Sequence, residues 1–173
     1  FNFENSKYFA GHSLGEYSAL VSAQALKFED AVKLVFERGK AMQEAVPIGK
    51  GGMLAVIGLK IEEIKKFIEK ISSDGVCEIA NDNSEGQTIV SGNTNSIENL
   101  KDILIKNKKR AIPLSVSAPF HCSLMKSAAT NMQDKINSTN FSRPKHEIIS
   151  NVTSSPVSDP ETIKDLLIKQ IYS

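Results

Sequence analysis

Ser13 lies between two glycines, in the motif Gly-His-Ser-Leu-Gly of residues 11–15. The short apolar segment 7–10 before it predicts a buried strand, and the apolar residues of segment 14–26 recur at helical spacing. A strand, a sharp turn and a helix form the setting in which a serine is raised above a sheet as a nucleophile. An ordinary surface turn would also explain the glycines, but the flanking elements favour a nucleophilic Ser13.

A serine hydroxyl needs a base to accept its proton, and the chain has three histidines. His12 directly precedes Ser13, so we expect its side chain to point away from the hydroxyl and to line the site. His146 lies in a polar segment and is expected to be a solvated loop residue. His121, in a loop of small residues after Pro119, is the best candidate base, with a structural histidine as the alternative. No nearby Asp or Glu is a convincing third member, so the orienting group is a backbone carbonyl or lies outside this chain.

Arg38 lies within an apolar stripe of the helix expected over residues 28–45. It follows Leu34 by four positions and precedes Met42 by four, so all three share one helix face. An unpaired guanidinium buried there would cost several kcal/mol, so we expect an anion beside it. Two anions are possible: a carboxylate of the protein itself, or a substrate carboxylate held by both arms of the guanidinium.

The composition excludes several classes of protein. The chain of 173 residues has 21 basic and 20 acidic residues and a formal net charge of +1, so it lacks the footprint of a nucleic-acid or anionic-membrane binder. No apolar run has the length of a membrane span, and no signal peptide is present. The two cysteines, Cys77 and Cys122, are interpreted as reduced thiols, and we expect a cytoplasmic protein.

The middle of the chain predicts a ferredoxin-like α+β subdomain over residues 51–116. Strands and helices alternate there in the order strand, helix, strand, strand, helix, strand, which is typical of that arrangement. The expected elements are a strand at 53–59, a helix at 61–72, strands at 76–81 and 87–92, a helix at 96–107 capped by Ser96, and a strand at 110–116.

The subdomain interrupts a larger α/β hydrolase-like domain with a parallel sheet. Residues 1–50 form its first part, and residues 117–173 return to it with a helix, a strand and a last helix, expected at 123–136, 147–152 and 160–172. Asp159 and Pro160 suit the start of that last helix. Only two strands are predicted outside the subdomain, whereas sheets usually have four or more. We therefore expect this domain to be incomplete and the chain, which does not begin with Met, to be an internal piece of a longer enzyme.

Taken together, these segments resemble the malonyl-CoA:acyl carrier protein transacylase family, which includes the acyltransferase domains of fatty acid and polyketide synthases. The resemblance extends in order across essentially the whole chain. Its segments are GHSLGEYSAL, ERGKAMQEAVP, GGMLAVIGL, IANDNSEGQTIVSG, APFHCSLM and SNV.

The resemblance implies a role for each candidate residue. Ser13 is the acylated nucleophile, His121 its catalytic partner, and Arg38 the residue that holds the malonyl carboxylate. The Leu14 amide is an oxyanion donor, and Phe120 would crowd an α-methyl group and so favour malonyl. The remaining residues expected to line the acyl pocket are His12, Met42, Met53, Asn81 and Asn151.

The family further implies a ping-pong transfer from malonyl-CoA, with release of coenzyme A, to the phosphopantetheine thiol of an acyl carrier protein. It requires no metal or redox cofactor, and a monomer is expected. Two site glutamines of the family, one supplying an oxyanion contact and one orienting the histidine, would lie before residue 1 and after residue 173. We therefore expect the 173-residue piece alone to be a poor catalyst.

Two other functional classes stay open. A serine hydrolase or thioesterase would share the turn around Ser13, and a non-catalytic docking remnant would keep only the fold. The sequence also does not decide between a stand-alone enzyme and one domain of a synthase.

Overall fold

The computed structural model describes residues 5–71 and 75–173, which fall into two compact units. The first unit comprises residues up to Ala41 together with Ala129–Gln170, and the second comprises Met42–Ala128 together with Ile171–Ser173. The second unit is thus longer than the predicted subdomain 51–116, because the segments on either side of it make contacts within it. Ser117 Oγ donates to Gln43 Oε1 at 2.7 Å, for example, and Thr94 Oγ1 donates to the carbonyl of Gly49 at 2.8 Å.

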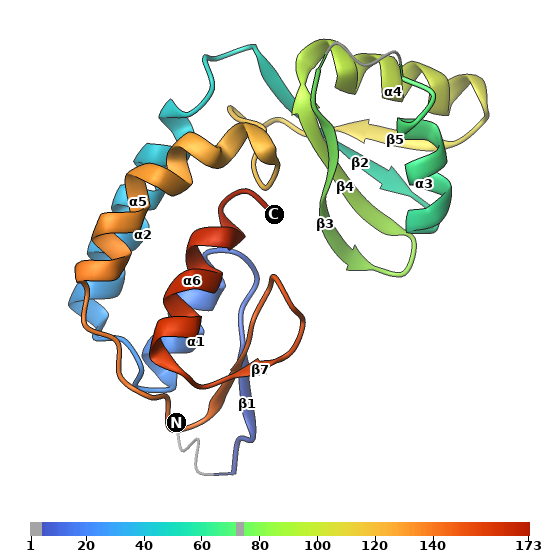
Figure 1. The fold of residues 1–173 in the computed structure, drawn as a ribbon. Helices are drawn as coiled ribbons and strands as arrows, with labels where there is room; N and C mark the ends of the chain where they lie inside the picture. The colour runs from blue at the N-terminus through green and yellow to red at the C-terminus, as the bar shows by residue number, and fades with distance from the viewer. Residues whose placement is uncertain (1–4, 72–74) are drawn as a thin grey trace. The chain divides into compact units, whose positions relative to one another are not determined.

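The first unit contains a three-stranded sheet in the order β1-β6-β7. Strand β1 (Tyr8–Ala10; Figure 1) pairs in parallel with β6 (Glu147–Ile149). Phe9 lies opposite Ile148 in the register. This pairing confirms the predicted parallel sheet. The short strand β7 (Pro156–Val157) adds to β6 in the antiparallel sense. The sequence analysis missed β7 because two residues, one of them proline, carry no period-2 pattern.

Among the described residues, the helices that belong wholly or partly to this unit are α1 (Gly15–Ser22), α2 (Phe28–Glu44), α5 (Lys126–Ser138) and α6 (Pro160–Gln170). Helix α2 begins in the first unit, and its last residues belong to the second. Helix α5 begins in the second unit and continues in the first. The helix predicted over 14–26 ends at Ser22, because the chain turns through Gln24, which has a φ of 60°. The helix predicted over 123–136 opens as a short 3₁₀ turn, η1 (Ser123–Met125), before α5.

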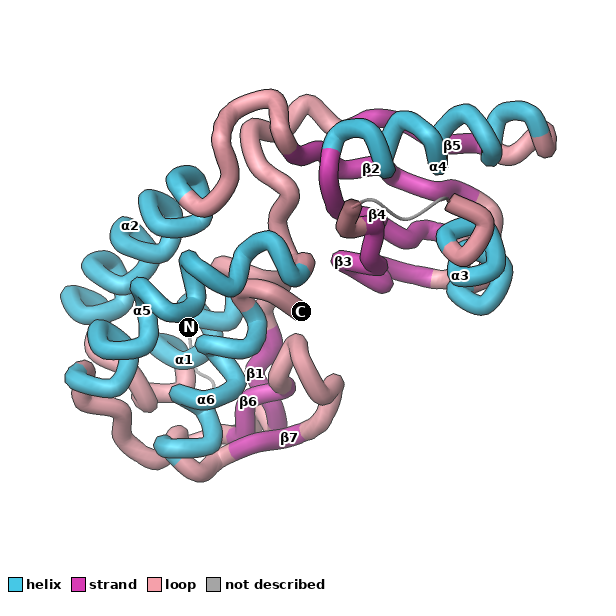
Figure 2. The backbone as a smooth tube through the Cα atoms, turned by 45° about the horizontal axis from the view of Figure 1, so that its top comes forward, coloured by secondary structure: helices cyan, strands magenta, loops and turns pink. Residues whose placement is uncertain are grey.

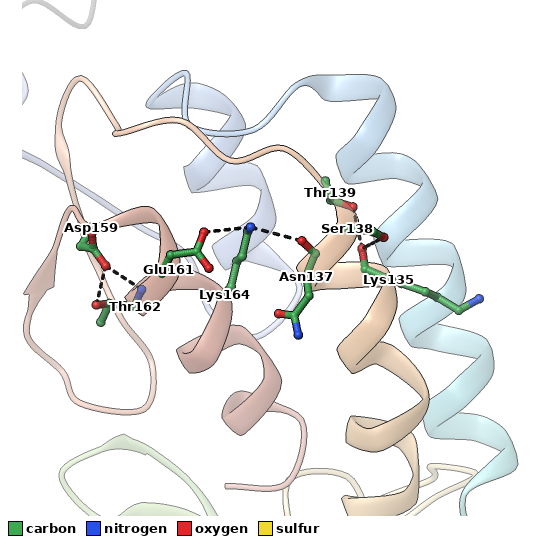
Figure 3. Close-up of polar contacts among 8 residues, drawn as sticks. All are labelled: Lys135, Asn137, Ser138, Thr139, Asp159, Glu161, Thr162 and Lys164. Atoms are coloured by element: carbon green, nitrogen blue, oxygen red, sulfur yellow. Dashed lines mark hydrogen bonds and ion pairs between the residues drawn. The ribbon is translucent and has the colours of Figure 1, made fainter.

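The start of α6 is fixed by side chains in the way that the sequence predicts. Asp159 Oδ2 accepts hydrogen bonds from the Thr162 amide and hydroxyl, each at 2.8 Å (Figure 3). One turn later, Lys164 Nζ donates to Glu161 Oε1 at 3.0 Å and to the carbonyl of Asn137 at 3.3 Å. Lys164 therefore ties the beginning of α6 to the C-terminal end of α5.

The second unit confirms the predicted ferredoxin-like arrangement. Its elements are β2 (Gly51–Ile57), α3 (Ile61–Ile68), β3 (Cys77–Ser84), β4 (Gln87–Asn93), α4 (Thr94–Lys106) and β5 (Arg110–Pro113). The strands form one antiparallel sheet in the order β3-β4-β2-β5 (Figure 2).

Strand β2 divides the core of this unit by alternation. Leu54 and Val56 pack with Ile64 of α3 and Leu100 of α4 on one face of the sheet. Met53, on the other face of β2, joins a smaller apolar cluster. Helices α3 and α4 thus cover one face of the sheet, and the other face carries the smaller cluster.

Several boundaries in this unit differ from the sequence predictions, including those of β2, which covers Gly51–Ile57, and β5, which ends at Pro113. Helix α4 begins at Thr94 after Asn93, so Ser96 is not its cap but lies buried inside the helix. Strand β3 continues to Ser84, beyond its predicted end at residue 81, because bulges accommodate its polar end. Helix α3 ends at Ile68, and the predicted end at residue 72 lies outside the described residues. No helix within the described ranges is long and apolar enough to span a bilayer.

Candidate active site

The turn between β1 and α1 holds Ser13 in a left-handed conformation, with a φ of 52°. Residues other than glycine rarely adopt this conformation, and such strain persists where the surrounding structure enforces it. The turn is tight because the strand end approaches the helix start closely. A Cβ atom on Gly11 would lie 2.0 Å from the carbonyl oxygen of Gly15, whereas a Cβ on Gly15 would meet nothing within 4 Å. The close approach of strand and helix therefore requires a glycine at position 11 but not at position 15.

Asn151, which follows β6, holds the two sides of this turn together. Its Oδ1 accepts from the Ser13 amide at 2.6 Å, and its Nδ2 donates to the Gly11 carbonyl at 2.8 Å. The structure thus brings this predicted pocket residue to the backbone of the candidate nucleophile. Leu14 and His12 are adjacent to Ser13, and both have exposed side chains.

Arg38 of α2 points at the Ser13 hydroxyl. Its Nη2 donates to Ser13 Oγ at 2.9 Å and to Gln170 Oε1 at 3.0 Å, and only 6% of the residue is exposed. Its guanidinium carbon lies 6.0 Å from the centre of the Tyr17 ring, a cation–π contact. Among the described residues no carboxylate forms an ion pair with Arg38, and its Nε has no hydrogen-bond partner. Two anions were considered above as partners of Arg38. The first of them, a carboxylate of the protein itself, does not contact Arg38 among the described residues.

Two buried polar residues of this site were missed by the sequence analysis, Glu16 and Gln170. Glu16 is 2% exposed, and its Oε2 accepts from Gln170 Nε2 at 2.6 Å and from the Asn151 amide at 3.3 Å. Gln170 Nε2 also donates to the Ser13 carbonyl at 3.0 Å. A glutamine inside the chain thus reaches Ser13, whereas the resemblance led us to expect the site glutamines only before residue 1 and beyond residue 173.

A signal for Gln170 was present in the sequence. It continues the apolar stripe of α6 that contains Ile163 and Leu167, and it is itself 1% exposed. A polar residue in such a stripe carries the same information that identified Arg38. Glu16 gave no comparable signal, because an acidic residue in the first turn of a helix is ordinary.

Burial governs the electrostatics of these groups. It raises the pKa of the Glu16 carboxyl above its ordinary value, against the hydrogen bonds from Gln170 and Asn151 and the charge of Arg38. Burial likewise lowers the pKa of the Arg38 guanidinium, against the attraction of Tyr17 and Glu16. Each charge therefore helps the other to remain ionised inside the unit, and for Glu16 the hydrogen bonds from Gln170 and Asn151 contribute more than Arg38 does.

The second unit carries His121, which is 7% exposed and, like Ser13, left-handed, with a φ of 57°. The chain after it is anchored by Glu78 of β3. Glu78 Oε2 accepts from the Ser123 amide at 2.8 Å and Oε1 from the Ser123 hydroxyl at 2.6 Å. This carboxylate caps η1 immediately beyond the candidate base. Cys122 Sγ donates to the carbonyl of Pro119 at 3.1 Å and closes the same loop.

The remaining predicted pocket residues divide as follows. Met53 and Phe120 belong to one apolar cluster of the second unit, which also contains Ala55, Ala80 and Ile89. Asn81 is half-buried on β3 at a shift in strand register. Met42 is buried near the end of α2.

His146 differs from its prediction as a solvated loop residue. It is half-buried, and its ring packs on Phe9 with 5.3 Å between ring centres. Within the described ranges, no cluster of three or more His, Cys, Asp or Glu side chains is placed to hold a metal ion.

The comparisons with known proteins agree on one family. The model of the acyl transferase domain matches residues 5–169. The chain is 43% identical over 166 residues to malonyl CoA-acyl carrier protein transacylase of Bacillus subtilis, covering 95% of this chain and 52% of that protein. It is 44% identical over 165 residues to the protein of the same name from Salmonella typhimurium, covering 95% of this chain and 53% of the other.

Solved structures give the same result. The malonyl CoA-acyl carrier protein transacylase of Coxiella burnetii superposes with a TM-score of 0.93 at 42% identity, over 96% of this chain and 53% of that one. A malonyl-transacylase solved in complex with a type II polyketide acyl-carrier protein gives a TM-score of 0.93 at 39% identity, over 96% and 54% of the two chains. The chain thus spans about half the length of the curated relatives it matches.

Proposed function

The chain belongs to the acyl transferase domain family, and from this membership we propose that it transfers a malonyl group from malonyl-CoA to an acyl carrier protein. The transfer would supply fatty acid synthesis. The observation that carries the proposal is the contact between Arg38 and Ser13, in which a buried guanidinium donates to the candidate nucleophile at 2.9 Å. A cation in that position suits an acyl group that ends in a carboxylate.

In the proposed first half-reaction, Ser13 Oγ attacks the thioester carbonyl of malonyl-CoA while His121 accepts the hydroxyl proton. The Leu14 amide stabilises the oxyanion. The C–S bond then breaks, and the coenzyme A thiolate leaves with the proton from His121. This step leaves a malonyl ester on Ser13.

In the second half-reaction, the phosphopantetheine thiol of the carrier protein attacks the Ser13 ester. His121 takes the thiol proton and returns it to Ser13 Oγ as the ester bond breaks. Malonyl then resides on the carrier protein and the enzyme is restored. The chemistry as written needs no metal ion or redox cofactor.

Arg38 is proposed to bind the malonyl carboxylate. Its present acceptors, Ser13 Oγ and Gln170 Oε1, are both neutral. A carboxylate is a stronger acceptor for a guanidinium than a hydroxyl is, so the arriving substrate can replace Ser13 Oγ. This exchange would bind the malonyl group and release the serine hydroxyl toward its base in one event.

The proposed acyl pocket follows from the family resemblance. Its lining comprises His12, Met42, Met53, Asn81 and Asn151, with Phe120 crowding α-methyl groups. We further propose that the protein acts as a monomer in the cytoplasm, an environment that suits its two free thiols, Cys77 and Cys122.

The test is mass spectrometry of the full-length protein, as its gene encodes it, after exposure to malonyl-CoA. The malonyl mass should appear on the peptide that spans residues 9–26 and should leave when carrier protein bearing phosphopantetheine is added. A serine hydrolase would instead release free malonate without a carrier protein, and a docking remnant would gain no label. Labelling that survives S13A would exclude Ser13 as the acylated residue.

A further inference from the structure

The buried charges of the first unit, Glu16 and Arg38, are joined through an intervening amide. Gln170 donates from Nε2 to the Glu16 carboxylate at 2.6 Å and accepts at Oε1 from Arg38 Nη2 at 3.0 Å. Both charged residues are almost fully buried, at 2% and 6% exposure. The hydrogen-bonded path therefore runs from a carboxylate, through a neutral amide, to a guanidinium and on to Ser13 Oγ.

Two acceptors determine which way the Gln170 amide faces, the Glu16 carboxylate and the Ser13 carbonyl. An ionised carboxylate only accepts hydrogen bonds, so the amide must present its NH₂ group to Glu16. The same NH₂ group also donates to the Ser13 carbonyl at 3.0 Å. The amide oxygen is left facing the opposite way, toward Arg38, which only donates. Glu16 and the Ser13 carbonyl thus together select the one amide orientation that attracts the guanidinium, and Glu16 alone adds a negative charge to it.

Because Gln170 lies between them, Glu16 can balance the charge of Arg38 without contacting it. A buried guanidinium needs a nearby negative charge to offset its desolvation. A carboxylate in direct contact would supply that charge, but it would occupy the planar fork that a substrate carboxylate needs. With Glu16 one side chain away, Arg38 is balanced while its contacts are neutral and its Nε has no partner among the described residues.

We propose that Glu16 is a positioning residue for substrate selection, acting as the remote countercharge that holds Arg38 through Gln170. The proposal rests on the proposed function, because it deepens the role given there to Arg38. Glu16 itself touches neither substrate nor the reacting atoms. Its effect should therefore appear in the choice between acyl groups and not in the chemistry of Ser13.

The test compares kinetics of the full-length protein with malonyl-CoA and acetyl-CoA for E16Q, Q170M and the double variant. E16Q keeps the shape of residue 16 and removes its charge. We expect E16Q to lower kcat/KM for malonyl-CoA about tenfold, mainly through KM, and to change the value for acetyl-CoA less than about twofold. Q170M removes the bridge and should lower the ratio of the malonyl value to the acetyl value in the same direction; because Gln170 also donates to the Ser13 carbonyl, the acetyl value should fall as well. Adding E16Q to Q170M should then cost little more, because both changes break one path.

E37Q is the matched control, since Glu37 neighbours Arg38 in sequence but pairs at the surface with Lys135 at 2.6 Å. It should leave both substrates within about twofold of wild type. Thermal unfolding of each variant separates selectivity from loss of folded protein. Equal losses for the two acyl groups in E16Q, or an unchanged ratio in both single variants, would overturn the proposal. A wild-type protein that transfers no malonyl would instead overturn the proposed function.

Discussion

Ser13 and Arg38 each occupy a position that folding alone disfavours. Ser13 has a left-handed backbone, and Arg38 is a cation 6% exposed whose contacts are neutral. Glu16 adds a carboxylate at 2% exposure to the same cluster. Stability given up in this way is typical of sites that need a defined arrangement of charge.

The titration of Glu16 gives a stability test of this view. Burial raises its pKa above the ordinary 4.5, so the folded protein binds this proton more tightly than the unfolded chain does. The contribution of Glu16 to the free energy of unfolding is therefore fully present below pH 4.5 and is lost as pH rises through the raised pKa. E16Q cannot titrate, so its stability relative to wild type should increase over that window. Denaturant titrations at a series of pH values measure the difference, and parallel curves for the two proteins would contradict it.

The junction of β1 and α1 depends on one glycine. G11A would place a Cβ 2.0 Å from the Gly15 carbonyl oxygen, so strand and helix must separate. We expect a loss of about 3 kcal/mol or more, or failure to fold. G15A is the control, because its Cβ meets nothing within 4 Å. It should be neutral or stabilise by up to about 1 kcal/mol at a helix start. Chemical denaturation measures the free energy of unfolding of both variants. Equal values would show that the close approach of β1 and α1 is not enforced.

The turn η1 depends on a carboxylate from β3. E78A removes the acceptor for both the Ser123 amide and the Ser123 hydroxyl, which should cost about 1–2 kcal/mol. Because this cap follows His121 directly, the proposed base should lose its placement. Transfer of malonyl and acetyl groups should fall alike, in contrast to the selective effect expected of E16Q. E85A, at an exposed position in the β3–β4 turn, should change neither stability nor transfer. A normal rate in E78A would mean that η1 holds its position without this cap.

The sequence predicted most elements because their patterns are local. The continuous apolar run of β2 and the apolar stripe of α2 each indicate one structure. The short strand β7 and the early end of α1 at Ser22 depend on packing and backbone geometry that no local pattern records. The cap of α4 is Asn93 and not the predicted Ser96. A local pattern does not choose between them, because both residue types are acceptable at a helix start.

The candidate site was only partly predictable for a related reason. Ser13 could be identified from its glycine motif between a strand and a helix, and Arg38 because it interrupts an apolar stripe. Gln170 lies 157 positions from Ser13 in the sequence. Only the packing of α6 in the first unit brings the two residues into contact. The pairing of Glu16 with Gln170 is equally non-local.

Across the whole chain, the proposed catalytic and substrate-binding residues belong to both compact units. Ser13, Arg38 and Asn151 lie in the first, whereas His121, Phe120 and Met53 lie in the second. The family match extends over residues 5–169 and so includes both. The proposed reaction therefore uses residues of both units, and the proposed selection for an acyl group with a carboxylate rests on the cluster in the first unit.

The most direct test of this account is the selectivity of R38A in the full-length protein. kcat/KM is measured for malonyl-CoA and acetyl-CoA in wild type and R38A, and again in E16Q/R38A, where no buried carboxylate is left without its countercharge. Loss of a bidentate charged contact should lower the malonyl value about 10²-fold or more. The acetyl value should fall far less or rise, because acetyl has no carboxylate to bind. Equal losses for the two substrates in both backgrounds would show that Arg38 serves the fold and does not select the acyl group.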